Sequence, residues 1–175
     1  TNPYYRYSVT FRHYVPIVKN DILTFAYRLN YEGTFGESAP YYVLPFITVM
    51  GSNYDRDSMG GYRTIRGLMR NRVQGLDVGF YNIEFRYKFV EFQLWKQNIA
   101  FALSAFTDGA HVFRGYDMSN RTGEYMELYN KFVNPGKDGF HGSAGLGLRF
   151  IMNQNFIVAF EGAQCFNKQD GGFAF

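Results

Sequence analysis

The sequence predicts an all-β fold, an antiparallel β-barrel whose strands cross a membrane. Three observations support this prediction. Polar and apolar side chains alternate along several segments, aromatic residues are frequent, and the connections between segments are short and long in turn. The 175 residues include 15 Tyr, 19 Phe and 19 Gly. This composition favours strands and tight turns over helices.

Two segments alternate almost without interruption, as a strand with one polar and one apolar face does. The segment 22–32 places aromatic residues and leucines on one face, and mostly polar residues such as Arg28 on the other. The segment 80–90 repeats the pattern with Glu84 and Arg86 on its polar face.

Four further segments alternate less strictly, namely 5–15, 99–108, 143–152 and 156–164. A seventh begins at Gly172 and stops at Phe175, fewer residues than a membrane-crossing strand needs. We therefore expect six full strands and a stub.

The predicted connections differ in length according to the end of the sheet on which they lie. Those near 16–21, 91–98 and 153–155 are short, those at 34–76 and 109–142 are long, and 165–171 is intermediate. Outer-membrane barrels have tight periplasmic turns, long external loops and aromatic girdles at both membrane surfaces. The pattern thus predicts that residues 1–175 form part of such a barrel. A soluble antiparallel β domain is the alternative.

Composition argues against several other functions. The net charge of +3 is too small to indicate a nucleic-acid partner. The single cysteine, Cys165, excludes an internal disulfide framework and is expected to be an apolar filler without a role. The three histidines lack the spacing of metal ligands, and no nucleophile–base pair is evident. We expect no metal, no cofactor and no enzymatic activity. No signal peptide opens the chain, so we expect a processed chain or a fragment.

The long connection 34–76 contains the sequence Gly60-Gly61-Tyr62-Arg63-Thr64-Ile65-Arg66-Gly67. Loops of that length are usually functional. The motif resembles that of the BamA-type family (bacterial surface antigen family), in which Gly-Gly precedes a Val/Ile/Leu-Arg-Gly-aromatic tetrapeptide. Here Leu68 replaces the aromatic residue, while Arg66 keeps its place.

Other segments resemble the same family at matching positions, and together they cover almost the whole chain. These segments are 4–17, 81–86, 106–109, 142–149 and 166–170. The resemblance implies that the chain contributes the last seven strands of a barrel of about sixteen. It also implies that the loop folds back into the barrel, where its arginine pairs with acidic groups on the inner face.

Alternation independently places two carboxylates on that inner face. Glu84 lies on the polar face of 80–90, and Asp108 shares a face with the small residues of 99–108. A charge facing lipid would cost about 2–4 kcal/mol at mid-depth, so both should face inward. We expect Arg66 to pair with Glu84 and Asp108, in a motif that also uses Gly60, Gly61, Ile65 and Gly67. The alternative is that Arg66 is solvated and that Glu84 and Asp108 are ordinary polar residues of the barrel lumen or rim.

The resemblance further implies a bacterial outer-membrane factor that inserts client β-barrels without catalysis. A client's terminal strand would pair with an exposed strand edge. Outer-membrane lipids, client barrels and accessory assembly lipoproteins would be its partners, and nucleic acid would not. A two-partner-type secretion pore and a small structural or adhesion barrel are the alternatives.

Overall fold

The structure, a computed structural model, describes residues 4–35, 47–48, 56–57, 59–115, 123, 127, 139–153 and 155–175. In these residues seven strands form one antiparallel sheet, in the order β1-β2-β5-β6-β7-β8-β9. The strands are β1 (Tyr5–Pro16), β2 (Leu23–Phe35), β5 (Asp77–Leu94), β6 (Gln97–Arg114), β7 (Phe140–Met152), β8 (Phe156–Cys165) and β9 (Phe173–Ala174).

Three minor elements complete the described chain. A single 3-10 turn, η1 (Lys19–Asp21), lies between β1 and β2. The two-residue strands β3 (Ile47–Thr48) and β4 (Arg56–Asp57) pair with each other. No helix among the described residues is long and apolar enough to cross a membrane.

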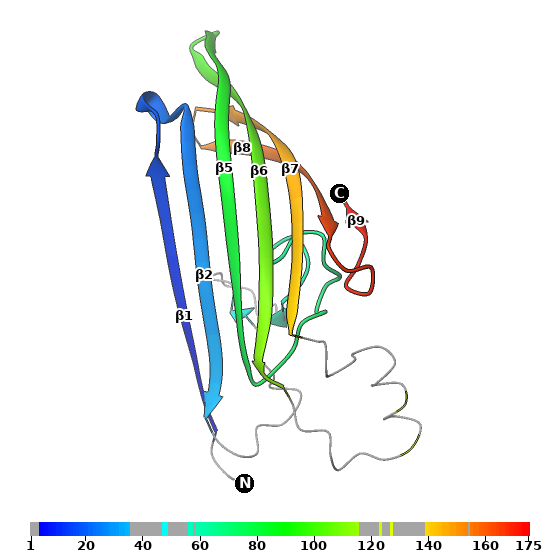
Figure 1. The fold of residues 1–175 in the computed structure, drawn as a ribbon. Helices are drawn as coiled ribbons and strands as arrows, with labels where there is room; N and C mark the ends of the chain where they lie inside the picture. The colour runs from blue at the N-terminus through cyan, green and yellow to red at the C-terminus, as the bar shows by residue number, and fades with distance from the viewer. Residues whose placement is uncertain are drawn as a thin grey trace.

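The predicted all-β antiparallel fold is confirmed, and the sheet is an open, curved wall (Figure 1). The β1–β2 and β5–β6 turns lie at one end of the sheet, and strands β2 and β6 end at the other. All seven predicted segments contain a strand, including the stub, which is β9.

The predicted short connection near 91–98 is present, but it is shorter than expected. Strands β5 and β6 continue to a two-residue turn at Trp95 and Lys96, where φ is 45° and 65°. The register of β5 against β6 shifts between Lys88 and Val90, which marks a β-bulge at Phe89. A bulge adds one residue and so reverses the alternation. Val90 therefore lies on the same face as Tyr87, and the strand continues past the point where the pattern breaks.

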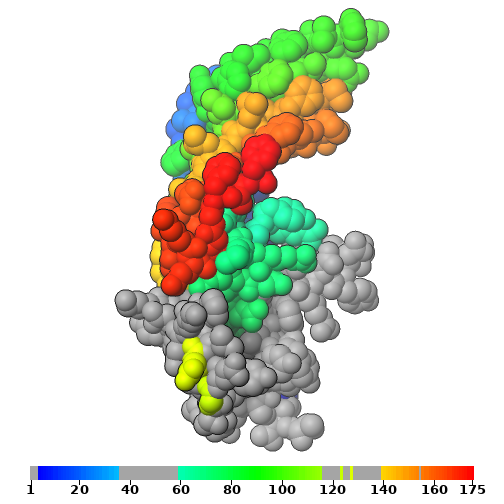
Figure 2. Space-filling view, turned by 90° about the vertical axis from the view of Figure 1, so that its right-hand side faces the viewer, coloured from blue at the N-terminus to red at the C-terminus, as the bar shows by residue number. Residues whose placement is uncertain are grey.

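The two faces of the sheet differ in the way that alternation requires. Along β6 the residues at even positions from Ala100 to Ala110 are buried, whereas Leu103 between them is 49% exposed. The buried face is the concave one, and the segment 59–76, here called the Arg66 loop, packs against it (Figure 2). The main apolar core lies between this loop and the sheet. It contains Met59, Ile65, Leu68, Val73, Val78, Phe80, Ala110 and Cys165.

A charge on the convex face should destabilise the protein in a bilayer according to its depth. We expect Leu103→Arg, at the middle of β6, to lower the free energy of unfolding by about 2–4 kcal/mol. Phe113→Arg, near the end of the same face, should cost at most about 1 kcal/mol. Denaturant unfolding in lipid vesicles measures both. Equal costs at the two positions would contradict a lipid-facing convex surface.

Candidate functional site

The Arg66 loop begins with a tight turn that depends on its two glycines. Gly60 and Gly61 have φ of 123° and 87°, values that favour glycine. A Cβ on Gly60 would lie 2.1 Å from the carbonyl oxygen of Met69. The Gly60 amide donates to the Thr64 hydroxyl at 2.8 Å, and the Ile65 amide donates to the Gly61 carbonyl at 3.1 Å. The turn therefore fixes the chain direction just before Arg66.

The backbone of Arg66 and Gly67 is hydrogen-bonded directly to the sheet. The Ser143 hydroxyl donates to the Arg66 carbonyl at 2.5 Å, and the Cys165 thiol donates to the Gly67 carbonyl at 2.6 Å. Gly67 has φ of 88°, and a Cβ there would lie only 3.0 Å from Cβ of Ala163. Only glycine combines this conformation with so close an approach to β8.

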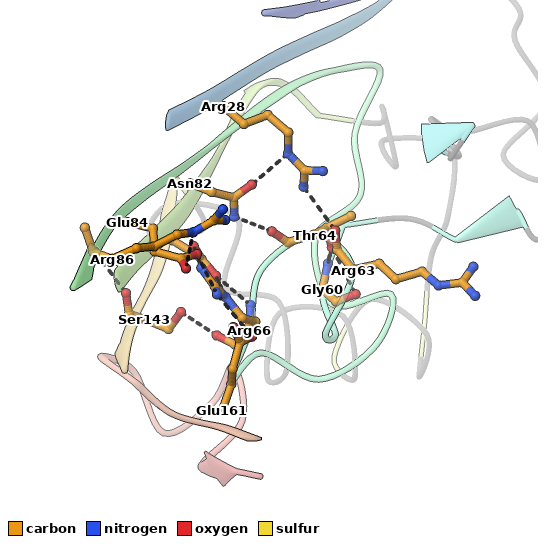
Figure 3. Close-up of polar contacts among 12 residues, drawn as sticks. Arg28, Gly60, Arg63, Thr64, Arg66, Asn82, Glu84, Arg86, Ser143 and Glu161 are labelled. Carbon is orange, nitrogen blue, oxygen red and sulfur yellow. Dashed lines mark hydrogen bonds and ion pairs between the residues drawn. The ribbon is translucent and has the colours of Figure 1, made fainter. Parts of the chain in front are cut away.

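The Arg66 side chain lies against β5, β6 and β8, where it contacts three carboxylates (Figure 3). Its Nε and Nη2 donate to the two oxygens of Asp108 at 2.8 and 2.9 Å, in the bidentate geometry of strong arginine–carboxylate pairs. Its backbone amide donates to the same carboxylate at 3.0 Å. Its Nη1 lies 3.2 Å from Glu84 and 3.1 Å from Glu161. Both carboxylates that the sequence proposed for Arg66 thus contact it.

Two more arginines help to neutralise these carboxylates. Arg149 Nη2 lies 2.6 Å from Glu84 and 2.8 Å from Glu161, and Arg86 Nε lies 2.9 Å from Glu84. Three guanidinium groups therefore balance the three carboxylates, here called the carboxylate cluster (Glu84, Asp108 and Glu161). A buried charge is tolerated when it is paired and hydrogen-bonded in this way.

The sheet leaves room for Arg66 by placing small residues beside one aromatic ring. Glu84, Phe106, Gly145 and Ala163 lie opposite one another across β5, β6, β7 and β8. The guanidinium carbon of Arg66 lies 3.4 Å from the centre of the Phe106 ring, a cation–π contact. A Cβ on Gly145 would lie 2.4 Å from that ring. Gly145 therefore allows the ring to lie flat beneath the guanidinium.

The surroundings keep Arg66 charged. Burial disfavours its charge, but the hydrogen bonds to Asp108 and the nearby carboxylates outweigh burial and raise the pKa of Arg66 above its usual value. Its side chain is 12% exposed. In the structure Arg66 is therefore an internal ion-pair partner and not a solvated loop residue.

Several residues of this site were missed from the sequence. Glu161 and Phe106 lie on inward faces, but alternation alone gave no reason to connect them with the loop. Arg149 shares a face of β7 with Gly145 and Gly147, and nothing in that pattern indicates its acidic partners. Cys165 packs in the apolar core as expected, and its buried thiol also donates a hydrogen bond to the Gly67 carbonyl, a role that the sequence did not indicate.

A second ionic contact anchors the end of the Arg66 loop. Asp170, fully buried in the β8–β9 connection, lies 2.9 Å from Arg72 Nη2 and 2.9 Å from His141 Nδ1. The Met69 amide donates to the Asp170 carbonyl at 2.9 Å, and Leu68 forms a β-bridge with Gly171. The loop is therefore held to the sheet at Arg66 and Gly67, and to the β8–β9 connection at residues 68–72. No group of three metal-ligating side chains occurs among the described residues.

Removal of the arginine should destabilise the barrel strongly. Arg66→Ala leaves the fully buried Asp108 without its partner, so we expect a loss of about 3–5 kcal/mol in the free energy of unfolding. Arg63→Ala, at an exposed position of the same loop, should cost much less. Heat-modifiability on gels and denaturant unfolding of the full-length protein report both values. If Arg66→Ala lowers the free energy of unfolding no more than Arg63→Ala does, the ion pairs of Arg66 contribute little to stability.

No protein-family model and no curated protein matches the chain. Among solved structures the chain is similar to the crystal structure of BamA from Haemophilus ducreyi lacking POTRA domains 1–3, with a TM-score of 0.63 and 18% identity. The similarity covers 97% of this chain and 34% of that chain, so the chain spans about a third of it. The chain therefore has the fold of part of a BamA-like β-barrel.

Proposed function

We propose that the protein is a bacterial outer-membrane assembly factor that helps other β-barrel proteins to insert into the membrane. The observation that carries this proposal is the contact of Arg66 with the carboxylate cluster. The BamA-like fold and the resemblance of the 60–67 motif support it. The activity requires no catalytic residue.

The geometry suggests how the loop would contribute. The Arg66 loop joins β5, β6, β7 and β8 through ion pairs and hydrogen bonds on their inner face. These strands would keep their curvature while another part of the barrel opens toward the lipid. A client strand could then pair with the exposed edge by β-augmentation. Arg66 would maintain the shape of the barrel without touching the client.

The partners follow from this proposal. Lipid would contact the convex face, which carries exposed residues such as Phe85, Leu103 and Phe160. Unfolded barrel proteins would be the clients, and accessory assembly lipoproteins would bind the periplasmic side. A secretion pore of the two-partner type is the second candidate, and it would differ by transporting a soluble client through the lumen.

Reconstitution of the full-length protein in lipid vesicles tests the function. We expect it to accelerate the folding of an unfolded outer-membrane barrel, read as heat-modifiability and protease protection, relative to protein-free vesicles. Arg66→Ala should abolish most of the acceleration at a temperature where the variant itself remains folded. Arg63→Ala should retain it.

Two outcomes would contradict the proposal. One is that the wild-type protein folds clients no faster than protein-free vesicles. The other is that it exports a soluble substrate and conducts ions continuously without any effect on barrel clients, which would favour the secretion pore.

A further inference from the structure

Arginines line a cavity next to the Arg66 loop in excess of the acidic residues available there. The cavity measures about 250 Å³, and six arginines line it. They are Arg12, Arg28, Arg63, Arg66, Arg86 and Arg149. The two acidic residues of the lining, Glu84 and Glu161, already pair with Arg66, Arg86 and Arg149. Two other arginines of the lining, Arg12 and Arg28, form no ion pair with Glu84, Glu161 or the neighbouring Asp108.

Arg12 and Arg28 lie on the neighbouring strands β1 and β2. Arg12 and Arg28 are directly opposite in the register of these strands, an arrangement that destabilises a strand pair when both residues carry the same charge. Arg28 donates to neutral acceptors, the side chain of Asn82 at 2.8 Å and the carbonyl of Arg63 at 3.0 Å. In the described part of the chain, no carboxylate forms an ion pair with Arg12 or Arg28.

Polar aromatic groups form another part of the lining. Tyr62 accepts a hydrogen bond from Arg63 Nε at 2.7 Å, and the guanidinium of Arg86 lies over the Tyr14 ring at 5.6 Å. Tyrosine hydroxyls can also donate to an oxyanion. The cavity thus combines two guanidinium groups without a counter-charge with nearby hydroxyl donors.

We infer that this cavity binds a phosphate group between Arg12 and Arg28. A phosphate monoester carries nearly two negative charges at neutral pH and therefore offsets both arginines, whereas a carboxylate offsets one. Guanidinium groups match the oxygens of a phosphate through paired hydrogen bonds. The phosphate belongs either to a soluble anion or to a lipid headgroup. The inference does not depend on the insertion function.

Binding would also affect the Arg66 loop. Arg28 holds the carbonyl of Arg63, and Asn82 donates to the carbonyl of Thr64 at 2.6 Å. A phosphate that fixes the Arg28 side chain would therefore restrain the backbone just before Arg66. Occupation of the cavity should raise the thermal stability of the barrel.

The test uses the full-length protein in phosphatidylcholine nanodiscs at constant ionic strength. One arm titrates inorganic phosphate, and the other replaces part of the lipid with phosphatidic acid. We expect a saturable rise in the unfolding temperature in at least one arm, and the responsive arm identifies the source. The double variant Arg12→Gln, Arg28→Gln should weaken the apparent affinity by about tenfold or more.

A matched control removes two positive charges outside the cavity. Lys19 and Lys96 are exposed in the β1–β2 and β5–β6 turns and do not line the cavity, and Lys19→Gln, Lys96→Gln should leave the response unchanged. If the Arg12 and Arg28 double variant fails to fold, the single variant Arg12→Gln, at an exposed position, replaces it. A non-saturable response, no response in either arm, or equal weakening by the lysine variant would overturn the inference.

Discussion

The burial of the carboxylate cluster is the constraint on which the rest of the structure depends. Asp108 is fully buried and Glu84 nearly so, and a buried carboxylate is tolerated only with a charged partner and hydrogen bonds. Arg66 supplies most of these contacts, although it comes from a loop and not from a neighbouring strand. The loop is therefore a structural part of the barrel wall.

The need to pair the buried carboxylate cluster with Arg66 also explains the residues that surround the guanidinium group. Gly67 allows the loop backbone to approach β8, and Gly145 leaves space for the Phe106 ring beneath the guanidinium. Cys165 and Ser143 satisfy carbonyl groups that would otherwise be buried without a donor. A side chain at Gly67 or Gly145 would conflict with Ala163 or with the Phe106 ring, both of which lie beside Arg66. A wall held in this way can keep its curvature when another part of the barrel changes, as the proposed function requires.

Much of the fold could be predicted because alternation is a local property. The inward positions of Glu84 and Asp108 followed from the parity of their strands and the cost of charge in lipid. The ion pair of Arg66 with Glu161 could not be predicted, because it depends on how far the sheet curves from β5 to β8. The true length of β5 was missed for another reason. The bulge at Phe89 reverses the alternation, so a continuing strand looks like its end.

The most direct test of the central claim is amide hydrogen exchange of the Arg66 loop in the full-length protein in nanodiscs. The amides of Ile65 and Met69 donate to Gly61 and to Asp170 of the β8–β9 connection. If the loop is fixed inside the barrel, these amides should exchange nearly as slowly as those of β6, and Arg66→Ala should remove the protection. Exchange at the rate of an unstructured chain in the wild-type protein would contradict the account.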